Sequence, residues 1–208
     1  MISMAISSMV IGAIYGVYTI QQRSYTVQEQ VSEMQQKGRA ALDVMVRDMR
    51  MVTFTEGCVG IAKIIKAAPE EFQFQYCDED TTTGAMQIYN FSYDLYDANG
   101  DGSIDLGRTK GGLKRALAEG VDALEFQYFD KEGNLTSDTK EIRSIQISLL
   151  IRASYPDPKY TDTIHHTPAS RKLDWDIKSS TSNPPNDRFH RRLLITTVKL
   201  RNMGLDDE

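Results

Sequence analysis

The chain has 208 residues, enough for one globular domain with a core plus an appendage but short for two ordinary domains. Its 24 basic and 29 acidic residues give a formal net charge of −5. Binding nucleic acid by charge needs clustered Lys and Arg, so we expect no nucleic-acid partner.

The first 22 residues carry no charged side chain, and the first charge is Arg23. As a helix rising about 1.5 Å per residue, this run is roughly 33 Å long, against about 30 Å for the hydrocarbon core of a bilayer. Serine and threonine hydroxyls within it can bond back to the helix backbone. We therefore predict that residues 1–22 form the membrane-spanning half of a helix, retained rather than cleaved as a signal peptide.

Apolar residues continue at spacings of three and four as far as Val52, with no Pro. This pattern predicts that residues 23–52 form the amphipathic half of the same helix. Gly12 and Gly16 form a GxxxG pair, which lets a second helix approach closely, so we interpret them as helix-packing residues. Gly38 weakens the helix and marks either a bend or a tight packing point.

Two cysteines occur, Cys58 and Cys77, and their spacing fits neither a CxxC redox motif nor a four-ligand zinc site. If the domain is exported, a disulfide between them closes a loop of about 20 residues and stabilises the fold by roughly 3 kcal/mol. The alternative is two unpaired thiols.

Residues 53–208 predict a β-rich globular domain, because short runs with a two-residue alternation follow Gly57, Gly60 and Pro69. Turn-forming residues at 130–134 favour antiparallel pairing of the third run with the fourth. The expected fold class is α+β, with an antiparallel sheet packed on the C-terminal half of the long helix. The five predicted strands are Glu71–Cys77, Met86–Leu95, Ala123–Phe129, Ile142–Arg152 and Arg192–Leu200.

The stretch from residue 97 to residue 105 resembles the first nine positions of an EF-hand loop. Calcium takes six to eight oxygen ligands, which short oxygen-bearing side chains around a tight turn can supply. The twelfth position, usually a bidentate acid, is Arg108, so another residue such as Asp94 has to substitute. The alternative is a solvated Asp/Asn/Gly turn. The predicted ligands of a structural Ca²⁺ are Asp97, Asn99, Asp101, Ser103 through its carbonyl, and Asp105.

Tyr155–Asp187 contains five of the six prolines and predicts a long surface excursion. We interpret His165 and His166 within it as solvated, and the basic group Arg188, Arg191 and Arg192 as a solvated strand margin. No nucleophile elbow, zinc-protease helix, P-loop or dinucleotide fingerprint is present. We therefore expect neither catalysis nor a small-molecule substrate.

Residues 2–52 resemble the N-terminal helix of type IV minor pilins of the PilW-like class and of related type II secretion pseudopilins. The segments YDANGDGSIDLGR, VDALEFQYFD, IRSIQISLLIRASYPDPKYTDT and RRLLITTVKLRNMG also resemble PilW-like proteins. The resemblance implies a pilin-like fold and other pilins as partners through the N-terminal helix. It also implies attachment to the inner membrane by a single pass, a periplasmic domain and incorporation into an extracellular pilus.

Precursors in this family carry a leader that ends in Gly and a Glu a few residues further on, recognised by a peptidase that cleaves and N-methylates. The leader is not present before Met1, and the Glu is missing from the residues that follow it, so Met1 resembles a residue a few positions inside the mature helix. The expected function is a noncatalytic minor pilin in the priming or tip complex of a type IV pilus. The alternatives are a type II secretion pseudopilin and a membrane-anchored calcium-binding adhesin or sensor.

Overall fold

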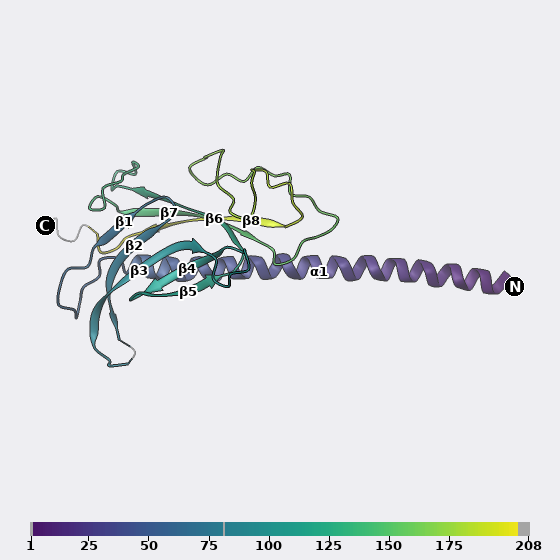
Figure 1. Cartoon of the computed structure of the whole chain (residues 1–208), viewed down its shortest axis with the longest axis horizontal. Coiled ribbons are helices and arrows are strands. Elements are labelled where there is room, and N and C mark those ends of the chain that lie inside the picture. The colour runs from purple at the N-terminus through teal and green to yellow at the C-terminus, as the bar shows by residue number, and fades with distance from the viewer. Residues whose placement is uncertain (1, 81, 204–208) are drawn as a thin grey trace.

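The computed structural model describes residues 2–80 and 82–203. Within them, one long helix precedes eight strands that form two antiparallel sheets (Figure 1). The elements are α1 (Ile2–Arg50), β1 (Ile64–Ala67), β2 (Phe72–Glu79), β3 (Met86–Tyr96), β4 (Asp105–Lys110), β5 (Leu113–Ala118), β6 (Val121–Phe129), β7 (Ser144–Arg152) and β8 (Arg191–Lys199).

Helix α1 has 49 residues, which corresponds to about 74 Å at 1.5 Å per residue. The Thr19 hydroxyl donates to the Gly16 carbonyl at 2.9 Å, so a polar side chain in the uncharged half is satisfied within the helix. Arg47 and Arg50 lie in the last turn, where positive charge favours the helix dipole. The helix ends two residues before the predicted end at Val52.

The predicted membrane span over residues 1–22 is not supported. No helix in the described part of the chain is long and apolar enough to cross a membrane. The physical reason is composition, because absence of charge is not the same as high apolar content. Hydroxyl and amide side chains dilute the apolar residues of this run: Ser3, Ser7, Ser8, Thr19, Gln21 and Gln22.

The strands form two sheets, whereas we expected one. The five-stranded sheet has the order β1-β2-β3-β4-β5, and the three-stranded sheet has the order β6-β7-β8. All five predicted strands are present, as β2, β3, β6, β7 and β8, and β6 pairs with β7 in antiparallel fashion as expected. The sequence did not predict β1, β4 and β5, because β1 has four residues and the other two are rich in Gly, Lys, Arg and Ala, which are poor strand formers.

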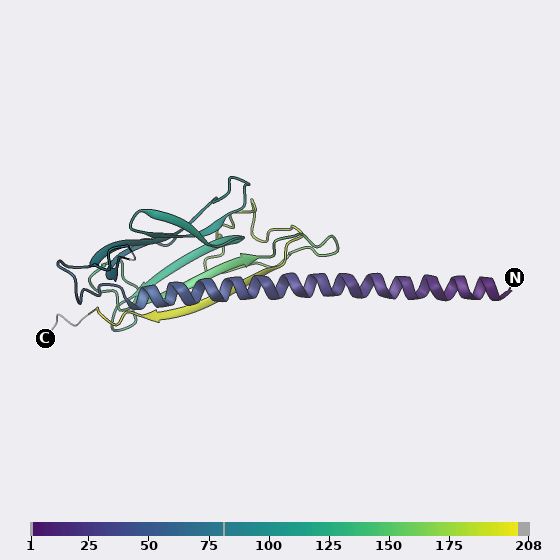
Figure 2. The same cartoon turned by 90° about the horizontal axis from the view of Figure 1, so that it is seen from below.

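The core lies between the C-terminal half of α1 and both sheets (Figure 2). The sheets meet through aromatic rings, because Phe72 of β2 lies 6.0 Å from Phe126 and 5.6 Å from Tyr128 of β6, measured between ring centroids. The helix buries one stripe at the predicted spacings of three and four. Its buried apolar residues are Met34, Ala41, Leu42, Met45 and Met49.

Gly38 is where α1 approaches the three-stranded sheet most tightly. A Cβ atom at this position would lie 2.6 Å from Leu194 Cδ1 and 3.3 Å from Ile151 Cγ2. Of the two roles expected for Gly38, the structure shows a tight packing point.

Residues 153–190, which we call the strap, run between β7 and β8 without helix or strand. The strap covers part of the three-stranded sheet, where Trp175 and Ile177 bury against Ala123 and Leu150. Figure 1 shows that the strap also extends beyond the sheets along α1, toward the N-terminal end. The predicted excursion is therefore a packed structural part with its own small apolar cluster.

Candidate interaction surface

The N-terminal half of α1 projects out of the domain, as both views show (Figures 1 and 2). Single exposed apolar residues are ordinary on a protein surface, but a contiguous set indicates a contact site. The exposed apolar residues of this half are Met9, Val10, Ile11, Ile14, Tyr15, Val17, Tyr18, Ile20 and Tyr25. Three of them are consecutive, so the apolar surface extends around the helix rather than along one stripe.

Gly12 and Gly16 lie on this projecting part. A Cβ atom built at either position meets nothing within 4 Å. Unlike Gly38, the two glycines therefore pack against no other part of the chain within residues 2–80 and 82–203, and they leave the helix backbone open to a neighbouring helix.

A buried carboxylate fixes the other half of α1 to the five-stranded sheet. Asp48 Oδ2 accepts hydrogen bonds from the Tyr93 hydroxyl at 2.7 Å and from Arg108 Nε at 2.6 Å. Burial, followed by the charge of Asp48, raises the pKa of Tyr93 far above its ordinary value, so this hydroxyl stays a donor. Arg108, at the twelfth position of the predicted calcium loop, is thus engaged with the helix.

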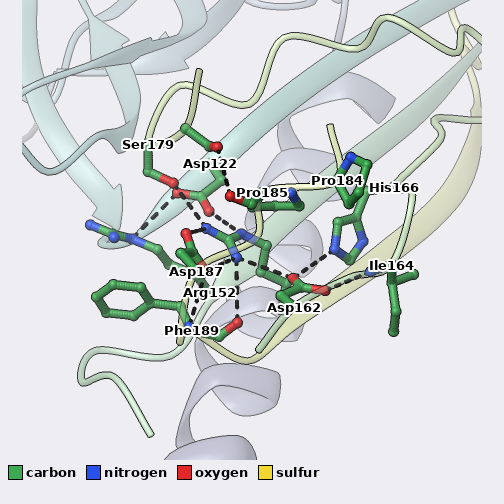
Figure 3. Close-up of polar contacts among 12 residues, drawn as sticks. Asp122, Arg152, Asp162, Ile164, His166, Ser179, Pro184, Pro185, Asp187 and Phe189 are labelled. Carbon is green, nitrogen blue, oxygen red and sulfur yellow. Dashed lines mark hydrogen bonds and ion pairs between the residues drawn. The ribbon is translucent and has the colours of Figure 1, made fainter. Parts of the chain in front are cut away.

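A second polar cluster fixes the strap to the three-stranded sheet (Figure 3). Arg191 of β8 has a fully buried side chain, and its guanidinium reaches Asp122 of β6 at 2.6 Å and two strap residues, Asp187 at 2.6 Å and Asp162 at 3.1 Å. Arg152 of β7 adds an ion pair to Asp122 at 3.3 Å. One cation therefore joins the sheet to two distant points of the strap.

Burial opposes ionisation of two carboxylates of this cluster, Asp122 and Asp187. It raises the pKa of Asp122, in spite of the positive charges of Arg191 and Arg152. Burial also works against ionisation of Asp187, but hydrogen bonds from Arg191 hold the pKa of that carboxyl below its ordinary value. Because a buried charge without a partner is costly, these groups depend on one another.

Two sequence predictions are corrected here. Arg191 is not part of a solvated strand margin, because its side chain is fully buried, although its neighbour Arg192 is exposed. His166 is buried with its Nε2 2.9 Å from Asp162 Oδ2, whereas only His165 is exposed as expected. Asp187 is four residues from Arg191, but Asp122 and Asp162 lie 69 and 29 positions away, so no local pattern could reveal the buried cluster.

The strap also reaches α1. Arg23, the first charged residue of the helix, forms an ion pair with Asp157 of the strap. The two residues are 134 positions apart, and they meet where the helix leaves the domain.

In the 97–105 loop, two of the predicted calcium ligands, Asp97 and Asp105, accept hydrogen bonds from the backbone. Asp97 accepts from the backbone N–H groups of Gly100 at 2.6 Å and Gly102 at 3.0 Å. Asp105 is buried and accepts from Ala98 at 3.3 Å and Gly120 at 3.2 Å. These carboxylates organise the turn through the backbone, which is the behaviour of an Asp/Asn/Gly turn.

The remaining three predicted ligands, Asn99, Asp101 and Ser103, line a surface pocket of about 410 Å³ together with Glu119 and Arg152. Asp94, the suggested substitute ligand, instead pairs with Lys114 at 2.6 Å. Within residues 2–80 and 82–203, no group of three or more His, Cys, Asp or Glu is placed so that it could hold a metal ion. Calcium binding stays a prediction.

Cys58 and Cys77 are joined by a disulfide, with their Cα atoms 5.9 Å apart. The bond ties the loop after α1 to β2, next to the backbone hydrogen bond from Cys77 to the Phe54 carbonyl at 2.7 Å. It therefore closes the turn by which the chain passes from the helix into the five-stranded sheet.

Comparison with known families identifies residues 94–202, just over half of the chain, as a match to "Type IV Pilus-assembly protein W", or PilW. The chain belongs to this family. The match begins at the end of β3 and includes the 97–105 loop, the three-stranded sheet and the strap. The long helix lies outside it, so membership of the PilW family does not depend on the helix.

Among solved structures, the PilW-family chain is similar to a type IV-like pilin, TTHA1219, from Thermus thermophilus. The TM-score is 0.50 at 14% sequence identity, and the alignment covers 81% of this chain and 97% of the other. This similarity shows a pilin-like fold and confirms the predicted combination of an N-terminal helix with antiparallel strands. No curated protein matches the chain.

Proposed function

We propose that this PilW-family chain is a noncatalytic minor pilin that takes part in type IV pilus assembly, within a priming or tip complex. The observation that carries the proposal is the projecting half of α1, which has exposed apolar residues around its circumference and, among the described residues, open space around Gly12 and Gly16. Such a surface fits several neighbouring helices at once, as in a helical assembly. Family and fold support the same proposal.

We also propose that the globular domain works outside the cytoplasm. Disulfides persist in oxidising compartments, and the Cys58–Cys77 bond supports a periplasmic or extracellular place. Attachment of the N-terminal segment to the inner membrane stays a prediction, which fractionation of cell membranes tests.

Deletion and complementation in the native host test the proposal. Deletion should abolish or strongly reduce surface pili, and the wild-type gene should restore them. A variant with Ile14→Glu and Val17→Glu should not restore pili, because charges on the projecting helix oppose burial against another helix. The matched control is Leu135→Glu, which changes an exposed residue of the domain and should restore pili.

The same strain separates the alternatives. Intact pili with a loss of protein secretion would favour a type II secretion pseudopilin. Intact pili and secretion with a loss of adhesion would favour a membrane-anchored adhesin. Either result would contradict the minor-pilin proposal.

A further inference from the structure

The further inference concerns the point at which α1 leaves the domain. Met34 is the first buried residue of the apolar stripe, and Val31 still packs at the edge of the core. More than two turns earlier, Arg23 is again covered in part, because the strap meets it there. The strap therefore extends the supported part of the helix beyond the sheets.

Asp157 is held firmly in the position from which it meets Arg23. Its backbone N–H donates to the Arg188 carbonyl at 2.8 Å, and its carboxylate accepts from the Lys159 N–H at 3.0 Å. His190 Nε2 lies 3.4 Å from the same carboxylate, and the His190 ring stacks on Tyr160 with centroids 3.8 Å apart. The carboxylate is thus held in place by Lys159, which follows it closely in the strap, and by His190 at the far end of the strap.

This loop is in turn joined to the sheet. The Ala153 N–H donates to the His190 carbonyl at 2.8 Å, which closes the base of the strap. The next residue, Arg191, is the buried cation that binds Asp122, Asp162 and Asp187. Hydrogen bonds and ion pairs, continued through the backbone from His190 to Arg191, therefore lead from Arg23 on the helix to the end of the three-stranded sheet at which β6 and β8 begin.

We propose that the strap is a bracket for α1 and that Asp157 is a positioning residue, which fixes the exit direction of the projecting helix by binding Arg23. This inference rests on the proposed function, because the exit direction matters for a helix that packs against other pilin subunits. On the side where the strap crosses at Arg23, a partner helix is excluded. Partner helices of other subunits approach the remaining faces of the projecting half.

The charge of Asp157 is consistent with this role. Hydrogen bonding from the Lys159 N–H and then the Arg23 guanidinium lower the pKa of Asp157 to about 2. The carboxylate is therefore ionised at any pH at which the protein is expected to work. Most helical stability in proteins comes from tertiary packing rather than from helix propensity, so support at Arg23 affects the order of the turns around it.

Hydrogen–deuterium exchange of the purified full chain tests the bracket. In Asp157→Asn and in Arg23→Gln, amides of residues 20–34 should exchange about three to ten times faster, because local opening becomes easier when a tether is lost. Asp157→Asn keeps a side-chain oxygen that can accept from the Lys159 N–H. The substitution therefore removes the negative charge but preserves the hydrogen bond that shapes the loop. Amides of residues 38–50, which lie under the sheets, should not change.

Two matched controls make the same chemical changes elsewhere. Asp174→Asn alters an exposed strap residue, and Arg39→Gln alters an exposed helix residue. Both should exchange like the wild type. The double variant Arg23→Gln/Asp157→Asn should exchange no faster than either single variant, because both remove one interaction.

Single variants that exchange like the controls would overturn the bracket, and so would a double variant whose effect is the product of the two single effects. The measurement uses the isolated protein, so it is independent of filament assembly. If exchange changes as expected but deletion of the gene leaves pili intact, the proposed function fails while the bracket stands. If deletion abolishes pili but exchange in the variants does not change, the bracket fails while the proposed function stands.

Discussion

Arg191 lies on β8 with its guanidinium against carboxylates from β6 and from two points of the strap. Replacing it by Met keeps much of the volume but leaves Asp122 and Asp162 buried without their shared cation. We expect Arg191→Met to lower the free energy of unfolding by about 3–5 kcal/mol, as when one partner of a buried ion pair is removed. Denaturant unfolding measures this.

The control for this prediction is the adjacent residue on the same strand. Arg192 is exposed, so Arg192→Met should change the free energy of unfolding by at most about 0.5 kcal/mol. Equal effects of the two substitutions would show that the buried cluster does not stabilise the fold.

Asp157 predicts a specific pH dependence. Its pKa in the folded chain is lowered to about 2, so its stabilising contacts are complete above the ordinary pKa of an aspartate and are lost as the pH falls through about 2. In an NMR titration, the carboxyl carbon of Asp157 should show a midpoint near 2. In Arg23→Gln the midpoint should rise, while remaining below the ordinary value because the Lys159 N–H still donates. The same midpoint in both proteins would contradict the ion pair.

At the scale of elements, α1 contains glycines in two different environments. Gly38→Val should destabilise the fold by about 1–3 kcal/mol, because the added atoms collide with Leu194 and Ile151. Gly16→Val is the matched control, with open space around it, and should leave domain stability unchanged. Thermal unfolding followed by near-ultraviolet circular dichroism compares the two. Equal loss of stability would mean that helix propensity, rather than packing, decides the outcome.

The 97–105 loop gives a test of the calcium prediction. If the loop binds Ca²⁺, adding the ion should raise the melting temperature of the wild type but not of Asp97→Asn/Asp101→Asn. The backbone hydrogen bonds of both carboxylates predict a second effect. The double variant should melt at a lower temperature even without Ca²⁺, since it loses charge-assisted bonds to the turn. The same wild-type melting temperature with and without Ca²⁺ would contradict the prediction that the loop binds calcium.

Periodicity predicted the elements whose pattern is long or alternating. Helix α1 and strands β2, β3, β6, β7 and β8 all follow such patterns. The division into two sheets could not be predicted, because it depends on contacts such as Phe72 with Phe126, which are distant in sequence. The same reason applies to Arg191, since a basic residue at a strand end is usually solvated unless distant acids surround it.

At the scale of the whole molecule, the chain combines a compact domain with a helix that is half embedded and half projecting (Figure 2). Asp48 holds the embedded half from the side of the five-stranded sheet, and the strap meets the helix again at Arg23. Gly38 allows the three-stranded sheet to approach closely between them. These contacts leave the apolar surface of the projecting half exposed, and under the proposed function this surface is the one that other subunits contact.

The most direct test of this account is photo-crosslinking in cells that make pili. A photoreactive amino acid at Ile14, which is 63% exposed on the projecting helix, is compared with one at Leu135, which is 66% exposed on the domain. We predict that position 14 captures other pilin subunits much more efficiently than position 135. Absence of pilin adducts at position 14, or equal capture at the two positions, would contradict the assignment of the projecting helix as the assembly surface.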